Sequence, residues 1–170
     1  MNDVLMDFDR SFTLLTDDAT AGLARRIAPV LAAGDVILLK GPIGAGKTHF
    51  ARSLIQARLA ELGRAEDVPS PTFTLVQVYE AGPVEIWHAD LYRLTQADEV
   101  VELGLADAFE AGICLVEWPE RLGRYAPANA LTLSLAPDSS GTARRAHLCA
   151  SDQRWAGLFT VLDGAGYLDE

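Results

Sequence analysis

The sequence predicts a single α/β domain over residues 1–170, with a central mixed, largely parallel sheet flanked by helices. Two apolar runs, Val36–Leu39 and Ile113–Val116, are typical of strands that are covered on both faces, as in the middle of a parallel sheet. A glycine-rich segment follows the first run directly and leads into a helical pattern. A chain of 170 residues is long enough for one sizeable core and short for two.

Periodicity and turn signals predict the remaining elements. Ser11–Leu15 alternates like a strand, and Thr16 is a suitable N-cap for a helix that runs to about Ala33, where Gly34 ends it. Further strands are expected at 73–80, 84–89, 131–135 and 145–149, and helices at 47–62, 98–109 and 152–163. The strands 131–135 and 145–149 are expected at an edge of the sheet, joined by the turn 138–141.

The glycine-rich segment Gly41–Thr48 has the spacing G-x-x-x-x-G-K-T of a P-loop. Its glycines let backbone N–H groups turn toward phosphate oxygens, and the following helix directs its positive end at them. Lys47 would reach the β and γ phosphates, and the Thr48 hydroxyl would be a magnesium ligand. The sequence therefore predicts a P-loop NTPase that binds ATP with Mg²⁺ and hydrolyses it.

Two predicted strands end in a carboxylate, which a P-loop enzyme needs to hold or orient magnesium. Asp90 follows one strand and Glu117 follows the other, and position alone does not rank them. Thr72, in a proline-ordered loop, is a candidate for a hydroxyl that senses the γ-phosphate, although an ordinary loop is an equal alternative. His88 alternates with Asp90 on one strand face and is either a neighbour of the site or a packed structural residue.

Composition and charge narrow the class of protein. The chain has 49% hydrophobic and 22% charged residues, no apolar run long enough to cross a membrane and no basic leader, so we expect a cytoplasmic protein. Cys114 and Cys149 have no CxxC partner, which favours buried free thiols. The net charge of −10 makes binding of nucleic acid through its phosphates alone a poor prediction.

The charge is unevenly distributed along the chain. Residues 40–64 contain five basic side chains and one carboxylate, so positive charge surrounds the predicted phosphate site. Residues 65–120 contain twelve carboxylates and one arginine. That acidic stretch is either a surface for a basic partner protein or an ordinary solvated face.

Two functions other than a partner-dependent ATPase are compatible with the P-loop. A small-molecule kinase would need a lid with arginines over the phosphates, for which Arg121 and Arg124 are candidates. A nucleotide-gated binding module would use ATP to change its affinity for a partner. A GTPase is disfavoured, because Lys40 and Lys47 are the only lysines and neither belongs to an Asn-Lys-x-Asp element.

Four blocks together resemble the bacterial TsaE (YjeE) family over residues 10–135: the P-loop, Ser70-Pro-Thr-Phe-Thr-Leu75, His88-Ala-Asp-Leu-Tyr-Arg93 and Val116-Glu-Trp-Pro-Glu120. The resemblance implies an accessory ATPase for threonylcarbamoylation of tRNAs reading ANN codons. Such a protein docks on the TsaB–TsaD complex, contacts tRNA only indirectly and lacks the transferase centre.

The resemblance also implies roles for individual residues. Lys47 would bind phosphates, Thr48 and Glu117 would hold magnesium, and Asp90 would be needed for hydrolysis. Asp90, Lys47 and Glu117 are therefore the expected catalytic residues, and Trp118 would lie beside the nucleotide. The chain has Ile43 where leucine is usual and His49 where a second hydroxyl is common. The residues expected to contact the nucleotide are Gly41, Gly44, Ala45, Gly46, Lys47, Thr48, His49 and Thr72.

Overall fold

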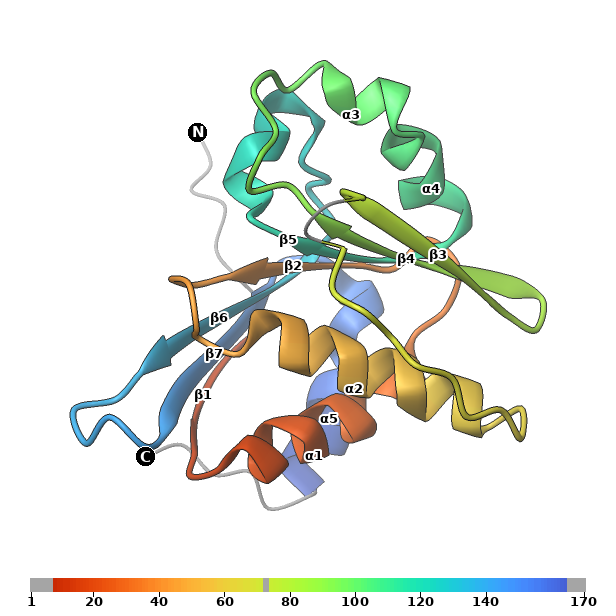
Figure 1. Ribbon diagram of the computed structural model, residues 1–170. Helices are drawn as coiled ribbons and strands as arrows, with labels where there is room; N and C mark the ends of the chain where they lie inside the picture. The colour runs from red at the N-terminus through yellow and green to blue at the C-terminus, as the bar shows by residue number, and fades with distance from the viewer. Residues whose placement is uncertain (1–7, 72–73, 165–170) are drawn as a thin grey trace.

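A seven-stranded mixed sheet forms the centre of the computed structural model, which describes residues 8–71 and 74–164 (Figure 1). The strand order is β1-β7-β6-β2-β5-β4-β3. The four central strands, β6, β2, β5 and β4, are parallel, and antiparallel pairs complete both sides. The strands are β1 (Phe8–Leu14), β2 (Val36–Lys40), β3 (Val76–Ala81), β4 (Val84–Asp90), β5 (Ile113–Glu117), β6 (Leu131–Pro137) and β7 (Arg144–Ala150).

The expected hairpin of the last two strands forms, but its predicted position at an edge is wrong. β6 pairs with β2 in the parallel centre, and β7 lies between β6 and β1. The edge strands within the described residues are β1 and β3. A turn signal indicates that two strands pair with each other, but it carries no information about the neighbours on their far sides.

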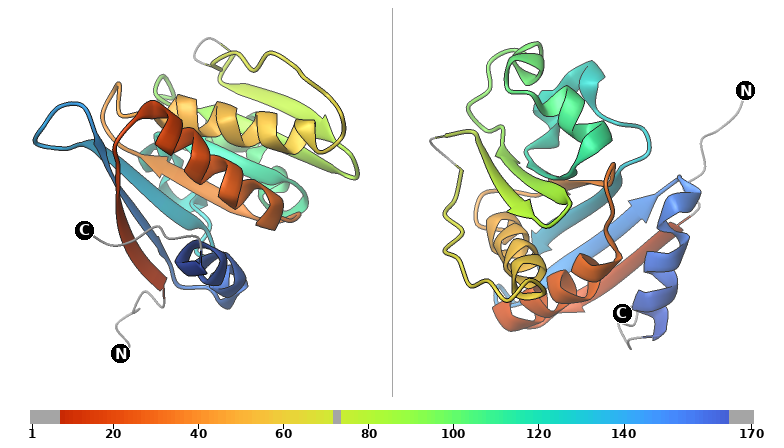
Figure 2. Two further views of the ribbon diagram at one scale, coloured as in Figure 1. Left: turned by 90° about the horizontal axis from the view of Figure 1, so that it is seen from below. Right: turned by 90° about the vertical axis from the view of Figure 1, so that its right-hand side faces the viewer.

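Helices cover both faces of the sheet (Figures 1 and 2). α1 and α2 pack side by side on one face, together with α5, and α3 and α4 lie on the other. The α-helices are α1 (Asp17–Ile27), α2 (Lys47–Ala60), α3 (Glu99–Glu102), α4 (Leu105–Ala111) and α5 (Ala156–Gly164), and the 3₁₀ helices are η1 (Ala28–Val30), η2 (Pro119–Tyr125) and η3 (Gln153–Trp155).

Two predicted helices are interrupted in the structure. The helix expected to reach Ala33 ends at Ile27 and continues as η1, because Pro29 has no N–H for an α-helical bond. The helix expected at 98–109 is divided into α3 and α4 by Gly104, which has a φ of +83°. This left-handed conformation favours glycine and turns the chain between the two helices.

Successive side chains of the central strands point to opposite faces of the sheet, so the core consists of two clusters, one on each face. The same alternation decides on which face a polar residue at the end of a strand lies. Ile37 and Leu115 face α2, whereas Leu38 and Val116 face α4 and η2. By the same alternation, Glu117 at the end of β5 lies on the α2 face. No helix in the described part of the chain has the length and apolar character needed to cross a membrane.

Candidate functional site

The segment 41–46 connects β2 to α2 by a turn that depends on glycine. Gly44 and Gly46 have φ values of +82° and +104°, and Gly46 immediately precedes the first residue of α2. A Cβ on Gly41 would lie 2.3 Å from the backbone oxygen of Leu135, so the loop approaches β6 too closely for a side chain. The segment therefore has the compact shape that was expected for a phosphate cradle.

The side chain of Lys47 reaches the first residues of this loop. Its ammonium donates hydrogen bonds to the backbone oxygens of Gly41 and Pro42, the latter at 3.1 Å, and lies 3.9 Å from the centre of the Trp118 ring. Burial is the main influence on this group and lowers the pKa of Lys47, although nearby carboxylates act in the opposite direction. A partly desolvated cation at the centre of the loop is well placed to attract phosphate oxygens.

Thr48 and Glu117 meet beside the loop, although they are 69 residues apart in the sequence. The Thr48 hydroxyl lies 2.8 Å and 2.9 Å from the two carboxylate oxygens of Glu117. The contact forms because β5 pairs directly with β2 and its last residue faces the N-terminal end of α2. Hydroxyl and carboxylate oxygens are hard donors of the type that Mg²⁺ prefers.

His88 is fully buried and is a second hydrogen-bond partner of the Glu117 carboxylate, in addition to Thr48. Its Nε2 lies 2.7 Å from Glu117 Oε2. Of the two interpretations of His88 from sequence, the structure supports a neighbour of the site. A second donor on the same carboxylate restricts its orientation, as a partner of a metal ligand commonly does.

Asp90 is the register partner of Glu117, at the end of the adjacent strand β4. Its Oδ1 accepts the N–H of Tyr92 at 3.1 Å. Burial raises the pKa of Asp90, the charge of Glu117 adds to that increase, and the Tyr92 hydrogen bond opposes it. A carboxylate of raised pKa is a better proton acceptor than an exposed aspartate.

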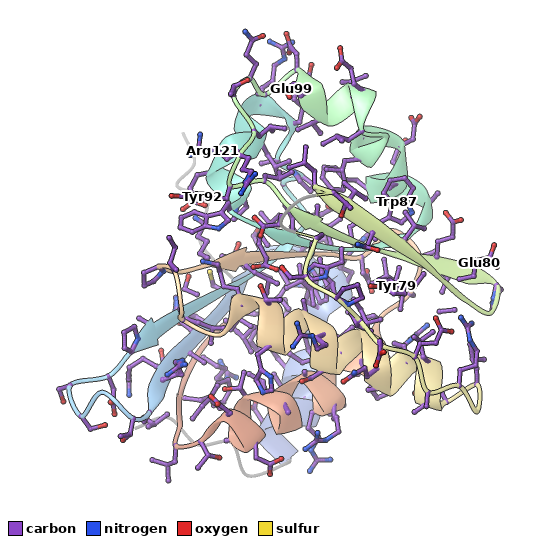
Figure 3. The ribbon with its side chains drawn as sticks, viewed as in Figure 1. Tyr79, Glu80, Trp87, Tyr92, Glu99 and Arg121 are labelled. Atoms are coloured by element: carbon purple, nitrogen blue, oxygen red, sulfur yellow. The ribbon has the colours of Figure 1, made fainter. Side chains whose placement is uncertain are left out.

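Two aromatic rings form one wall of the site. Trp118 has an unusual left-handed conformation, with a φ of 57°, which turns its ring over Lys47 and against Tyr92, with ring centres 4.9 Å apart. Figure 3 shows Tyr92 at the same side of the molecule as Arg121. Backbone conformations of this kind cost energy in a residue with a side chain and are concentrated at functional sites.

These residues line a cavity of about 460 Å³, a size typical of small-molecule sites. The predicted site residues Gly44 to His49, Asp90 and Glu117 come together there, and Gly41 lies beneath them. Thr72 lies outside the described residues. The lining residues are Ile43, Gly44, Ala45, Gly46, Lys47, Thr48, His49, Asp90, Tyr92, Arg93, Glu117 and Trp118.

The described residues on either side of positions 72–73 are hydrogen-bonded close to the site. Leu75, with a φ of 67°, accepts a hydrogen bond from the backbone N–H of Asp90 at 2.8 Å. Its own N–H donates to the oxygen of Pro71 at 2.7 Å. The polypeptide on either side of residues 72–73 is therefore held next to Asp90.

Tyr92 and Arg93 line the cavity and Arg144 contacts the glycine loop, although none of the three was predicted as a site residue from the sequence. Arg144 begins β7 and donates from Nε to the oxygen of Ala45 at 2.7 Å and from Nη2 to the oxygen of Gly44 at 3.2 Å. For Arg144 the sequence offered only an arginine immediately before the predicted strand 145–149, and neither periodicity nor motif indicated which loop it would reach.

The two arginines considered for a kinase lid are engaged elsewhere. Arg121 donates to the oxygen of Leu94 at 3.1 Å, and Arg124 is paired with Asp98 at 2.8 Å on the surface. His49 lines the cavity through part of its surface while its Nε2 lies 2.9 Å from the oxygen of Asp17 at the start of α1. These contacts give no support to a lid over the phosphates.

The family model described as "Threonylcarbamoyl adenosine biosynthesis protein TsaE" matches residues 14–146. The chain belongs to the TsaE family. This family of tRNA threonylcarbamoyladenosine biosynthesis proteins includes the TsaE protein of Rickettsia conorii, which is 41% identical over 108 residues, corresponding to 64% of this chain and 60% of that protein. The Nostoc sp. TsaE protein is 37% identical over 134 residues, 76% of this chain and 79% of that protein.

A solved structure is similar in fold as well as sequence. The crystal structure of Bacillus subtilis YdiB aligns with a TM-score of 0.74 and 26% identity, and the alignment covers 93% of this chain and 96% of that chain. The matched part of this TsaE chain includes all four sequence blocks and extends to Arg144. The family assignment and the mixed α/β fold expected from the sequence are both confirmed.

Proposed function

We propose that this chain is a Mg²⁺-dependent P-loop ATPase that serves as an accessory protein in threonylcarbamoyladenosine modification of tRNAs reading ANN codons. The observation that carries the ATPase proposal is the contact of the Thr48 hydroxyl with the Glu117 carboxylate beside the glycine loop. It brings a hydroxyl and a carboxylate to the place where a bound triphosphate would need its metal. Membership of the TsaE family supports the pathway.

The donor set fits Mg²⁺ with a bound nucleotide. Mg²⁺ is held through one or two protein oxygens, with water and phosphate oxygens completing its shell. Thr48 and Glu117 would supply the protein oxygens, and the described residues contain no group of three or more His, Cys, Asp or Glu side chains that would form a complete protein cage. When bound, Mg²⁺ would neutralise part of the phosphate charge.

The remaining residues have separate tasks in this proposal. Lys47 binds the phosphates, since its ammonium lies at the centre of the loop and already donates to two carbonyl groups. Asp90 accepts or orients a water proton, because its carboxylate is next to Glu117 and its pKa is raised mainly by burial. Lys47 and Glu117 thus act through the phosphates and the metal, whereas Asp90 acts on the attacking water.

The proposed partner is the TsaB–TsaD complex. A chain of this family would dock on that complex, and its ATP hydrolysis would permit repeated turnover of the modification reaction. We propose that tRNA is contacted only indirectly, a proposal supported by the net charge of −10. The protein would work in the cytoplasm, where the tRNAs that are to be modified are made.

The decisive test is phosphate release from Mg²⁺–ATP by the purified chain, alone and with TsaB and TsaD. We expect slow turnover alone and an increase of at least tenfold with both partners. A nucleotide-dependent pull-down with the same proteins measures docking separately. Activation by a small phosphate acceptor in place of TsaB and TsaD would contradict the proposal and favour a kinase.

A further inference from the structure

Arg144, at the start of β7, reaches across the sheet to the glycine loop and donates two side-chain hydrogen bonds to it. Figure 1 shows the β6–β7 connection and the β2–α2 loop at the same edge of the sheet. The Arg144 side chain is 21% exposed, and both of its loop contacts are to backbone oxygens. Arg144 therefore contacts the backbone of the loop and is not among the described residues that line the cavity.

We propose that Arg144 is a positioning residue that holds the glycine loop in its nucleotide-binding conformation before the nucleotide arrives. This inference rests on the proposed ATPase function and extends it. Arg144 would not contact the nucleotide. It would act on the peptide groups that do.

Peptide geometry provides the physical reason. The described residues contain no cis peptide bond, and in a trans peptide the C=O and the following N–H point in opposite directions. The Arg144 Nε bond of 2.7 Å draws the oxygen of Ala45 outward, so the N–H of Gly46 points inward. The Nη2 bond to Gly44 at 3.2 Å restrains the preceding peptide, whose own N–H, on Ala45, donates to the oxygen of Pro42 at 3.1 Å.

Glycine makes such a restraint valuable at this place. Gly44 and Gly46 have positive φ values and more conformational freedom than other residues, so an unrestrained loop would sample many peptide orientations. Binding a phosphate would then have to overcome the entropy of ordering the loop. Two hydrogen bonds from one planar guanidinium remove part of that cost in advance.

Arg144 also lies within ion-pair distance of one carboxylate, that of Asp17. Asp17, in the first turn of α1, lies 3.9 Å from Arg144 and is 81% exposed, so this ion pair contributes little energy. The two backbone contacts are therefore the part of the interaction that matters. A lysine in this position has one point charge and cannot reproduce the two-pronged contact.

The test compares Arg144→Ala with Arg145→Ala, which changes the net charge equally. Arg145 is bonded to Thr13 at 3.0 Å on the opposite face of β7 and serves as the matched control. We expect Arg144→Ala to weaken Mg²⁺–ATP binding about tenfold in calorimetry, and Arg144→Lys to recover only part of that loss. The Arg145→Ala protein should bind like the unmodified chain.

Hydrogen exchange of the nucleotide-free protein supplies the readout that a purely structural role would not affect. Amides of residues 44–48 should exchange faster in Arg144→Ala than in Arg145→Ala, with equal exchange in the central strands. If affinity falls without faster loop exchange, or exchange rises without loss of affinity, the positioning role is wrong. Arg144→Gln replaces the alanine variant if the latter does not fold.

The two proposals can fail separately. If the unmodified chain does not bind Mg²⁺–ATP, the proposed function is wrong, whereas the exchange measurement still tests whether Arg144 restrains the loop. If the unmodified chain binds and Arg144→Ala binds equally well, only the role of Arg144 is overturned.

Discussion

Glu117 is contacted from two sides, and this arrangement explains why a buried carboxylate can remain available for a metal. Thr48 approaches both of its oxygens, and His88 contacts one of them at 2.7 Å. A carboxylate held in this way keeps its orientation and its hydrogen bonds while it remains only 2% exposed. In the proposed function, His88 would therefore act through Glu117 rather than on the nucleotide.

A substitution at Asp90 tests whether nucleotide binding and hydrolysis depend on different residues. Asp90→Asn retains an oxygen for the Tyr92 N–H but can no longer accept a proton, so hydrolysis should fall about 100-fold. The dissociation constant of Mg²⁺–ATP should change less than about twofold. Single-turnover phosphate release and calorimetry measure the two quantities. A loss of affinity as large as the loss of hydrolysis would show that Asp90 acts in binding.

The two cysteines should differ sharply in reactivity. Burial raises the pKa of Cys114 to about 12, so almost none of its thiolate is present at pH 8. Cys149 is partly exposed, and its pKa is raised less strongly, mainly by burial and then by Asp9. A thiol reagent at pH 8 should modify one thiol in the native protein and the second only in denaturant.

The variant Cys149→Ser is the control for that measurement. It should show almost no reaction while the protein is folded. Two thiols reacting at similar rates in the native chain would contradict the burial of Cys114 inside β5.

At the scale of elements, the break between α3 and α4 depends on Gly104. A Cβ there would lie 3.3 Å from Trp87, and the φ of +83° would strain any other residue. Figure 3 shows Trp87 on β4, beside α4. Gly104→Ala should therefore lower the free energy of unfolding by about 1–2 kcal/mol, measured by urea denaturation.

Gly157→Ala provides the matched comparison within α5. Its Cβ would meet nothing within 4 Å, and alanine favours helix over glycine, so a gain of up to about 1 kcal/mol is expected. Equal effects of the two substitutions would contradict the account of the α3–α4 break.

The successes and errors of the sequence analysis have a common physical cause. Val36–Leu39, the glycine-rich segment and the strand-end acids are local patterns, and the structure brings Lys47, Thr48, Asp90 and Glu117 together as those patterns predict. The central position of β6, in contrast, depends on its pairing with β2. Such non-local contacts leave no periodic signal.

Arg144 is the most informative omission. It donates to the backbone oxygen of Ala45, which lies 99 residues earlier in the sequence. Every residue type has a backbone oxygen, so the side chains of the loop do not reveal this contact. No spacing rule connects the two positions. The structure was needed because the contact arises from the strand order, which places β7 two strands away from β2.

At the scale of the whole molecule, the strand order brings the site residues together at the carboxyl ends of the central parallel strands. β2, β5 and β4 are adjacent and parallel, so the glycine loop, Glu117 and Asp90 follow their carboxyl ends together. Open α/β sheets commonly bind ligands at these strand ends. The antiparallel strands β7 and β3 extend the sheet on either side, and β7 contributes Arg144 to the back of the loop.

The central claim is that Thr48 and Glu117 together hold Mg²⁺ with ATP at these strand ends. Titration calorimetry of ATP over a range of Mg²⁺ concentrations tests it most directly, with Glu117→Gln compared against Glu110→Gln, an exposed acid on α4 that changes the net charge equally. We predict that Mg²⁺ strengthens ATP binding at least tenfold in the unmodified chain and in Glu110→Gln, and by less than about twofold in Glu117→Gln. Equal enhancement by Mg²⁺ in all three proteins would contradict the claim.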